Sequence, residues 1–172
     1  FVGIKDELYM KIIIDNKIPY IKEAVQRIAD EVVYAPGKDF TPELVRDADA
    51  LIVRIAKCDG HAIEHSPNLK VIGRTGVGYD TVDIAAATAK GIPVVITPGA
   101  NNRSVAEHTV AMIFALSKNL IEGQNEMCTG NWEIRGAKKA FELEGKTVGV
   151  IGLGAIGRET AKICRGCGMK LA

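Results

Sequence analysis

The sequence lacks the features that mark membrane proteins, nucleic-acid-binding proteins and exported proteins. No apolar run among its 172 residues approaches the ~20 residues that a membrane-spanning helix needs. Its formal net charge is only +1 and it has no long basic run, so it offers no electrostatic footprint for nucleic acid. The opening segment FVGIKDELYM carries charges where a signal peptide needs an apolar region. We therefore expect a cytoplasmic globular protein without a membrane or nucleic-acid partner.

Cysteine is also scarce, and its spacing gives little support to a metal or redox site. Of four cysteines, only Cys164 and Cys167 form a C-x-x-C pair. A structural zinc site needs a second pair or nearby histidines, and neither accompanies this pair. We interpret the two as small side chains near a helix end and expect no metal. Met10 has the position of a natural start, which makes residues 1–9 an expected extension.

Short apolar runs alternate with helical patterns in the first part of the chain. The predicted strands cover residues 11–15, 32–34, 50–54, 69–73 and 92–97. An apolar stripe at helical spacing follows the first of them and consists of Ile21, Ala24, Val25, Ile28 and Ala29. Thr41 and Pro42 are typical of a helix start, and residues 83–91 have a helical composition that ends in glycine. Because the strands are apolar throughout, residues 1–97 are predicted to form a flavodoxin-like, doubly wound parallel sheet covered on both faces.

A long apolar helix and a polar segment follow this predicted domain. Ser104 and Glu107 have the spacing of a capping box and predict a helix over residues 104–120. The helix is apolar nearly all round, so we expect a second domain or another subunit to bury it. Residues 122–142 are predicted to be irregular and polar, with Trp132 as their only large anchor.

The last part of the chain contains a glycine-rich turn between a predicted strand and a predicted helix. Gly152, Gly154 and Gly157 form a complete G-x-G-x-x-G. In this motif the glycines permit a tight turn, close approach of the backbone to a pyrophosphate, and close packing of helix on strand. We interpret residues 98–172 as the first part of a Rossmann-type dinucleotide-binding domain, truncated before the acidic residue that would hold the adenosine ribose. A glycine-lined structural turn without a ligand is the alternative.

A second glycine-containing loop, residues 73–80, follows another predicted strand but lacks the dinucleotide spacing. Gly76 and Gly78 would let successive backbone N–H groups converge into an anion nest that suits a carboxylate. A strained connecting loop without a ligand is the alternative.

Two long segments carry a resemblance to a known family. Residues 69–113 (LKVIGRTGVGYDTVDIAAATAKGIPVVITPGANNRSVAEHTVAMI) and 141–161 (FELEGKTVGVIGLGAIGRETA) resemble the D-isomer-specific 2-hydroxyacid dehydrogenases, most of all the D-3-phosphoglycerate dehydrogenases. Residues 15–28 (DNKIPYIKEAVQRI) and 47–54 (DADALIVR) also resemble the erythronate-4-phosphate dehydrogenases. The resemblance implies an oxidoreductase with NAD, or alternatively NADP, as cofactor. Its substrate would be a small 2-hydroxy or 2-oxo acid, and preferably a phosphorylated one such as 3-phosphoglycerate.

The resemblance also implies roles for particular residues. The backbone at Val77 and Gly78 would hold the substrate carboxylate, with Val77 also approaching the nicotinamide. Arg54 and Arg74 match basic positions near the substrate phosphate, a task that suits a guanidinium, although solvated surface arginines are the alternative. Asn101 matches the polar start of the long helix, and this helix and the arm around Trp132 match elements through which family members form dimers. The cofactor would be held by Gly152, Gly154, Ala155, Ile156 and Gly157.

The family's catalytic histidine, its orienting carboxylate and its arginine all follow the dinucleotide turn and would lie beyond Ala172. His61 and His65 are expected in a polar, solvent-facing loop. His108 is expected to be a packing residue in the first turn of the long helix. The chain therefore resembles the N-terminal portion of a dehydrogenase, with no catalytic residue of its own, and we expect it to be inactive alone.

Two alternatives stay open at this point. One is a non-enzymatic, nucleotide-sensing module of the corepressor type, as in the C-terminal-binding proteins, because one fold serves both functions. The other is a dehydrogenase of the same family for glyoxylate, lactate, formate or erythronate 4-phosphate. Replacement of Arg54 and Arg74 distinguishes phosphorylated from unphosphorylated substrates.

Overall fold

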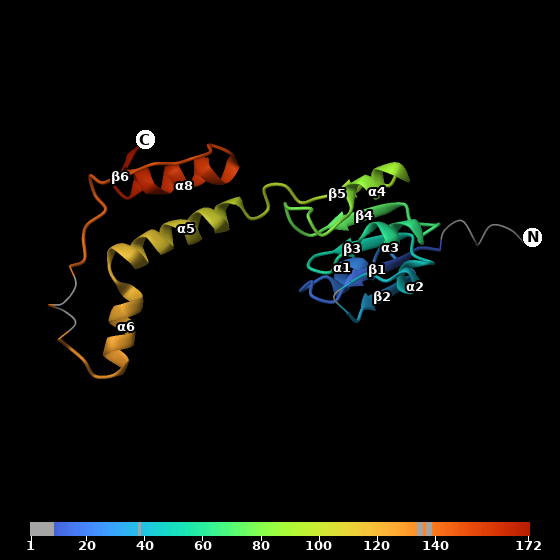
Figure 1. The fold of residues 1–172 in the computed structure, drawn as a ribbon, viewed down its shortest axis with the longest axis horizontal. Helices are drawn as coiled ribbons and strands as arrows, with labels where there is room; N and C mark the ends of the chain where they lie inside the picture. Colours follow the sequence, from blue (N-terminus) through green and yellow to red (C-terminus); the bar gives the residue numbers. More distant parts are fainter. Residues whose placement is uncertain (1–8, 38, 134–135, 137–138) are drawn as a thin grey trace, which may run out of the picture. The chain divides into compact units, whose positions relative to one another are not determined.

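The computed structural model describes residues 9–37, 39–133, 136 and 139–172 and divides into two compact units (Figure 1). The first unit ends at Pro98 and the second begins at Gly99. Over the residues described, no helix combines the length and apolar character needed to cross a membrane.

A five-stranded parallel sheet forms the first unit. Its strands are β1 (Lys11–Asp15), β2 (Glu31–Ala35), β3 (Ala50–Val53), β4 (Val71–Arg74) and β5 (Val94–Val95). They are ordered β2-β1-β3-β4-β5, and every neighbouring pair is parallel. This order confirms the predicted doubly wound sheet. It also places the switch point between β1 and β3, where the order of strand addition reverses.

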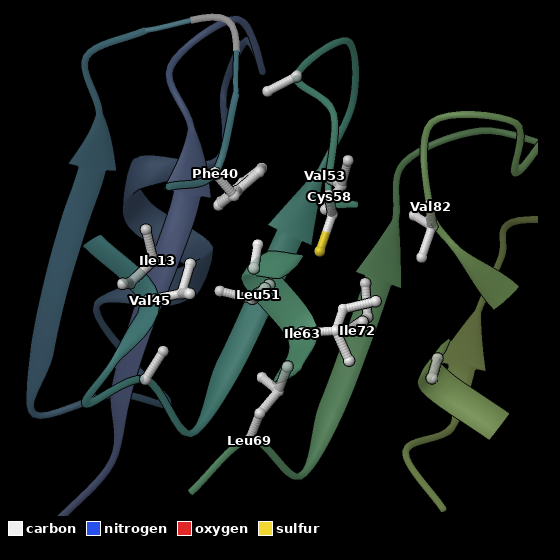
Figure 2. Packing of buried hydrophobic residues seen from close by; sticks show 14 of the residues in the cluster. Ile13, Phe40, Val45, Leu51, Val53, Cys58, Ile63, Leu69, Ile72 and Val82 are labelled. Atoms are coloured by element: carbon white, nitrogen blue, oxygen red, sulfur yellow. The ribbon is translucent and has the colours of Figure 1, made fainter. Parts of the chain in front are cut away.

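Helices cover both faces of this sheet. They are α1 (Lys22–Val25), α2 (Pro42–Val45), α3 (Gly60–Glu64) and α4 (Ile84–Ala89). Figure 2 shows Ile13, Leu51 and Ile72 of three strands in one buried cluster with Val45 of α2 and Ile63 of α3. Because successive strand residues point to opposite faces, Ile12 and Ile14 bury their side chains on the other face, against Val25 of α1. Each such side chain contributes about 1.5–3 kcal/mol by leaving water.

Local signals fix several helix ends as predicted. The Thr41 hydroxyl accepts a hydrogen bond from the Leu44 amide at 3.4 Å, and Pro42 occupies the first turn of α2. The Asp83 carboxylate accepts one from the Ala86 amide at 2.9 Å at the start of α4. Gly91 follows this helix with a φ of +68°, a left-handed conformation that glycine adopts without strain.

Two predictions for this unit were wrong. The apolar stripe at Ile21–Ala29 predicted a longer helix than α1, and Ile28 of that stripe is 62% exposed. The segment expected to be a polar loop around His61 forms α3. Its first turn is capped by Asp59, whose carboxylate accepts a hydrogen bond from the Ala62 amide at 2.9 Å. An aspartate cap before a short apolar stretch is enough for one helical turn.

The described part of the second unit includes long helices and short strands. These elements are α5 (Asn102–Ser117), α6 (Leu120–Cys128), β6 (Thr147–Val148), α8 (Ala155–Gly166) and β7 (Lys170–Leu171). Helices α5 and α8 pack around a small buried cluster of Val110, Leu143, Cys164 and Met169. Strands β6 and β7 pair in parallel, which confirms that a second strand begins near Met169.

Two expectations for this unit need correction, and a third stays untested. Helix α5 begins at Asn102, two residues before the predicted start. Glu107 pairs with Arg103 at 2.6 Å and does not form a capping box with Ser104. Helix α6 occupies part of the segment expected to be irregular, of which residues 134–135 and 137–138 lie outside the described residues. Leu116 of α5 is 77% exposed in the single chain, so burial of this helix by another subunit stays a prediction.

Candidate functional site

The carboxyl ends of the parallel strands define one edge of the first unit's sheet. β1 ends at Asp15, Arg54 directly follows β3, and β4 ends at Arg74. Val53 and Arg74 are register partners, so Arg54 and Arg74 leave the sheet at the same edge. Ligands of doubly wound sheets bind outside this edge, beside the switch point. The structure thus brings the two sequence-predicted arginines to the edge where a ligand is expected.

The loop after β4 presents backbone donors at this edge. The Gly76 amide donates to the Arg74 carbonyl at 2.9 Å, and the Gly76 carbonyl accepts from the Thr97 amide at 3.0 Å, so the loop is anchored. The amides of Val77 and Gly78 have no hydrogen-bond acceptor among the residues that the structure describes. Val77 and Gly78 are also exposed. Two adjacent free N–H groups can bind the two oxygens of a carboxylate.

The glycines of this loop lie beside two flexible side chains and do not have the conformation that the sequence predicted. Neither Gly76 nor Gly78 has the positive φ of a left-handed nest. A Cβ at Gly76 would lie 1.6 Å from Nη1 of Arg74, and one at Gly78 would lie 2.9 Å from Oδ1 of Asp80. The missing side chain of Gly76 therefore leaves the space in which the Arg74 guanidinium lies.

Both arginines contact backbone carbonyls. Nη1 of Arg74 donates to the Thr75 carbonyl at 2.7 Å, while its Nε is buried without a hydrogen-bond partner. Nη1 of Arg54 donates to the carbonyl of Lys17, in the turn after β1. A guanidinium has five N–H donors, so each arginine keeps donors for an anion.

Asp15 is a component of this edge that sequence reasoning missed. Its side chain is 1% exposed. Oδ2 accepts hydrogen bonds from the amides of Arg54, Ile55 and Ala56 at 3.1, 2.6 and 2.8 Å, and Oδ1 accepts one from the Lys17 amide at 2.9 Å. Burial raises the pKa of this carboxyl group, but the four amide hydrogen bonds outweigh it and the net pKa is lowered. The one sequence signal was an aspartate that closes an otherwise apolar strand.

The predicted dinucleotide turn lies in the second unit, between β6 and α8. Gly152 has a φ of +95°, which favours glycine, and Gly154 is the N-cap of α8. A Cβ at Gly157 would lie 2.1 Å from the Gly152 carbonyl oxygen, so only glycine permits this close packing. The Arg158 amide is the first to bond back to Gly154, which leaves the amides of Ala155 and Ile156 directed out of the helix start.

The surroundings of this turn fit the pyrophosphate of a dinucleotide. The N-terminus of α8 carries a partial positive charge, and Gly154 has no side chain over the free amides. Arg158 donates from Nη1 to the Leu153 carbonyl at 2.8 Å, which adds a full positive charge beside the turn. The free amides and the space for close approach of a pyrophosphate agree with what the three glycine positions predict for this turn.

The remaining predicted residues have other environments. Asn101 is the N-cap residue of α5, exposed and without a side-chain capping bond. His61 and His65 are exposed as expected, with ring centroids 4.4 Å apart, and within the described residues neither makes a hydrogen bond to a carboxylate. His108 is exposed in the second turn of α5, so its expected packing role is wrong for the described chain.

The buried cysteines Cys58 and Cys164 are poorly suited to act as nucleophiles. Burial, followed by the charges of Asp59 and Asp83, raises the pKa of the Cys58 thiol to about 12. Burial also raises the pKa of the Cys164 thiol, with a smaller effect of Cys167. A buried thiol with a raised pKa is a poor nucleophile. No group of three or more His, Cys, Asp or Glu residues that could hold a metal ion occurs among the described residues.

A doubly wound parallel sheet, followed by a strand, a G-x-G-x-x-G turn and a helix, defines a class of two-part α/β proteins with Rossmann-like architecture. Comparison with family models identifies the family within that class. Residues 10–165 match the model of the D-isomer specific 2-hydroxyacid dehydrogenase catalytic domain, and the chain belongs to this family.

Individual relatives agree with this assignment. An erythronate-4-phosphate dehydrogenase of Bacteroides fragilis is 41% identical over 163 residues, which are 94% of this chain and 41% of that protein. A D-3-phosphoglycerate dehydrogenase of Archaeoglobus fulgidus is 44% identical over 133 residues, or 75% of this chain and 25% of that protein. The NAD-dependent formate dehydrogenase of Staphylococcus aureus, solved in complex with NAD, superimposes with a TM-score of 0.80 at 29% identity, covering 94% of this chain and 55% of that one. The chain thus spans less than half the length of the erythronate-4-phosphate and D-3-phosphoglycerate dehydrogenases named above.

Proposed function

We propose that the complete protein is an NAD-dependent dehydrogenase that interconverts a phosphorylated D-2-hydroxy acid and its 2-oxo acid. The observation that carries this proposal is the carboxyl edge of the sheet. There, two free backbone amides and two arginines lie on neighbouring strands and loops, which matches the two anionic groups of such a substrate.

Each group of donors has a chemical task in this proposal. The amides of Val77 and Gly78 bind the carboxylate, and Arg54 and Arg74 bind the phosphate through charge-assisted hydrogen bonds. The free amides at the start of α8 bind the cofactor pyrophosphate. NAD, when bound, supplies the acceptor for a hydride from C2 of the hydroxy acid. None of the described histidines has a carboxylate that orients it, so we assign the acceptance of the hydroxyl proton to none of them.

The names of the two relatives described above support the phosphate preference. Their names, erythronate-4-phosphate dehydrogenase and D-3-phosphoglycerate dehydrogenase, each specify a phosphorylated substrate. Asn101, at the start of α5, stays a predicted substrate-binding residue that rests on the resemblance alone.

A matched pair of substrates tests the proposal. The complete protein is assayed for NADH oxidation with 3-phosphohydroxypyruvate and with hydroxypyruvate, which differ only in the phosphate. We expect kcat/KM to be at least about tenfold higher for the phosphorylated acid, and replacement of both arginines by alanine to abolish that ratio. Equal kcat/KM values for the two acids would contradict the proposed preference for a phosphorylated substrate. Tight NADH binding without turnover of any 2-oxo acid would instead favour a nucleotide-sensing module.

We also propose that the complete protein is a homodimer formed through α5 and α6. Their exposed apolar side chains include those of Met112, Leu116, Leu120 and Ile121, more apolar surface than an isolated helix pair normally leaves in water. Leu116→Asp should halve the molar mass measured by light scattering, whereas Ile28→Asp, at another exposed apolar position in the first unit, should leave the molar mass unchanged.

A further inference from the structure

We propose that Asp15 is a positioning residue, whose buried carboxylate fixes Arg54 at the place where it binds the substrate phosphate. This inference rests on the proposed function and extends it to a residue that does not contact the substrate. Asp15 closes β1, next to the switch point, and Arg54 follows β3, the neighbouring strand.

One carboxylate controls Arg54 at two separate points. Oδ2 of Asp15 accepts the amides of Arg54, Ile55 and Ala56, which fixes the backbone from which the Arg54 side chain extends. Oδ1 accepts the amide of Lys17 at 2.9 Å, and the Lys17 carbonyl in turn accepts a hydrogen bond from the Arg54 guanidinium. Both ends of the arginine are therefore attached, directly or through one residue, to the same buried group.

The chemistry at this position requires a carboxylate. All four partners are N–H donors, and an ionised carboxylate is a pure acceptor with room for all of them. An asparagine of the same shape would direct its NH2 group at N–H donors on one side or the other, whichever way the amide is turned. The four amide bonds and the 1% exposure also leave Asp15 without access to a substrate, which separates it from the catalytic residues.

The advantage to the enzyme is a lower entropic cost of phosphate binding. A free arginine side chain loses rotamer entropy when it is ordered. An arginine that is already held on the Lys17 carbonyl has lost part of this freedom before the substrate arrives. Loss of Asp15 should therefore weaken binding of the phosphate and leave the hydride-transfer step intact.

The test compares Asp15→Asn with a matched control, Asp49→Asn, in the complete protein. Asp49 precedes β3 at the opposite edge of the same sheet, and its carboxylate accepts the Lys11 amide at 2.9 Å and pairs with Lys70 at 3.0 Å. Asp15→Asn should raise KM for 3-phosphohydroxypyruvate roughly tenfold, and change kcat and the KM for hydroxypyruvate by less than about twofold. Asp49→Asn should keep the wild-type ratio of the two KM values. Equal changes for both acids in Asp15→Asn would overturn the inference.

A double-mutant cycle tests whether Asp15 acts through Arg54. In an Arg54→Ala background, Asp15→Asn should cause no further rise in the KM for the phosphorylated acid, because the residue that it positions is gone. Additive effects of the two substitutions would show that Asp15 acts by another route.

A measurement on the wild type covers the case in which Asp15→Asn does not fold. The Ile55 side chain is 60% exposed, yet its amide donates to Oδ2 of Asp15 at 2.6 Å, so this amide should exchange with deuterium much more slowly than a free surface amide. Free exchange at Ile55 would contradict the inference. If the wild type shows no preference for the phosphorylated acid, the proposed function fails; if the preference exists and Asp15→Asn retains it, only the positioning role fails.

Discussion

At the scale of single residues, the addition of one methyl group at Gly157 tests the packing of the dinucleotide turn. Its Cβ position lies 2.1 Å from the Gly152 carbonyl oxygen, which belongs to the backbone and cannot move without opening the turn. Gly157→Ala in the complete protein should weaken NADH binding by about tenfold or more, measured by fluorescence titration. Gly166→Ala is the control, because a Cβ at this last residue of α8 meets nothing within 4 Å. Equal NADH affinities of the two variants would contradict the close packing.

The lowered pKa of Asp15 predicts how this residue contributes to stability as the pH changes. Its folded pKa lies below the unfolded value of about 3.9, so the stabilisation is fully present above about pH 4 and is lost as the pH falls through the folded pKa. Asp15→Asn should therefore lower the free energy of unfolding at pH 6 and flatten its decline between about pH 4 and pH 2. Urea unfolding over this range measures both effects. Parallel acid limbs for wild type and variant would show that Asp15 does not titrate with folding.

At the scale of elements, a lysine from the end of α4 stabilises the end of α3. Nζ of Lys90 donates to the carbonyls of Ile63, Glu64 and Ser66 at 2.9, 3.1 and 3.1 Å. Ile63 and Glu64 belong to the last turn of α3, where carbonyls lack partners within the helix, and Ser66 directly follows its C-cap. Lys90→Met keeps the aliphatic stem and should lower the free energy of unfolding by about 1–2 kcal/mol in denaturant titrations. Lys70 is exposed, pairs with Asp49 and serves as the control. Lys70→Met should change the free energy of unfolding by less than about 0.5 kcal/mol.

The elements that could be predicted from the sequence are those with local signals. Thr41 and Asp83 cap their helices through residues three positions away, and the apolar runs of the sheet need no knowledge of distant partners. The start of α5 was misplaced because Arg103, four residues before Glu107, takes the carboxylate that the capping box would need. Helix α6 was missed because residues 122–126 in its middle, EGQNE, are polar apart from a glycine, which lowers helix propensity.

The residues of the candidate site also differ in whether local sequence signals predict them. Arg54 and Arg74 could be placed from the sequence, since each follows a recognisable strand and parallel strands end at one edge. Asp15 could not, because its amide partners Arg54, Ile55 and Ala56 are 39–41 positions away and are brought to it only by pairing of β1 with β3. The space over Gly76 depends on the rotamer of Arg74, which no local pattern specifies.

At the scale of the whole molecule, the two units differ in how much core each one buries. The larger cluster of the first unit contains sixteen buried residues beneath a five-stranded sheet, whereas the cluster of the second unit contains four, beside two strands of two residues each. Several apolar side chains of the second unit are fully or largely exposed, among them Ile151 and Leu153 beside the glycine turn. Two short strands alone are marginal in water, so the second unit should open more readily than the first.

Limited proteolysis of a polypeptide that consists of these 172 residues tests this difference. We expect the second unit to be degraded first and to leave a resistant product that ends between Pro98 and Arg103, identified by its intact mass. The same polypeptide should bind NADH weakly at best, since the turn at Gly152 depends on the less stable unit. A resistant product that spans both units would mean that the core around Val110 and Cys164 is sufficient to stabilise the dinucleotide turn without further sheet. If the second unit resists the protease only when NADH is added, its resistance comes from NADH binding. A ligand that binds only the folded state stabilises that state by mass action.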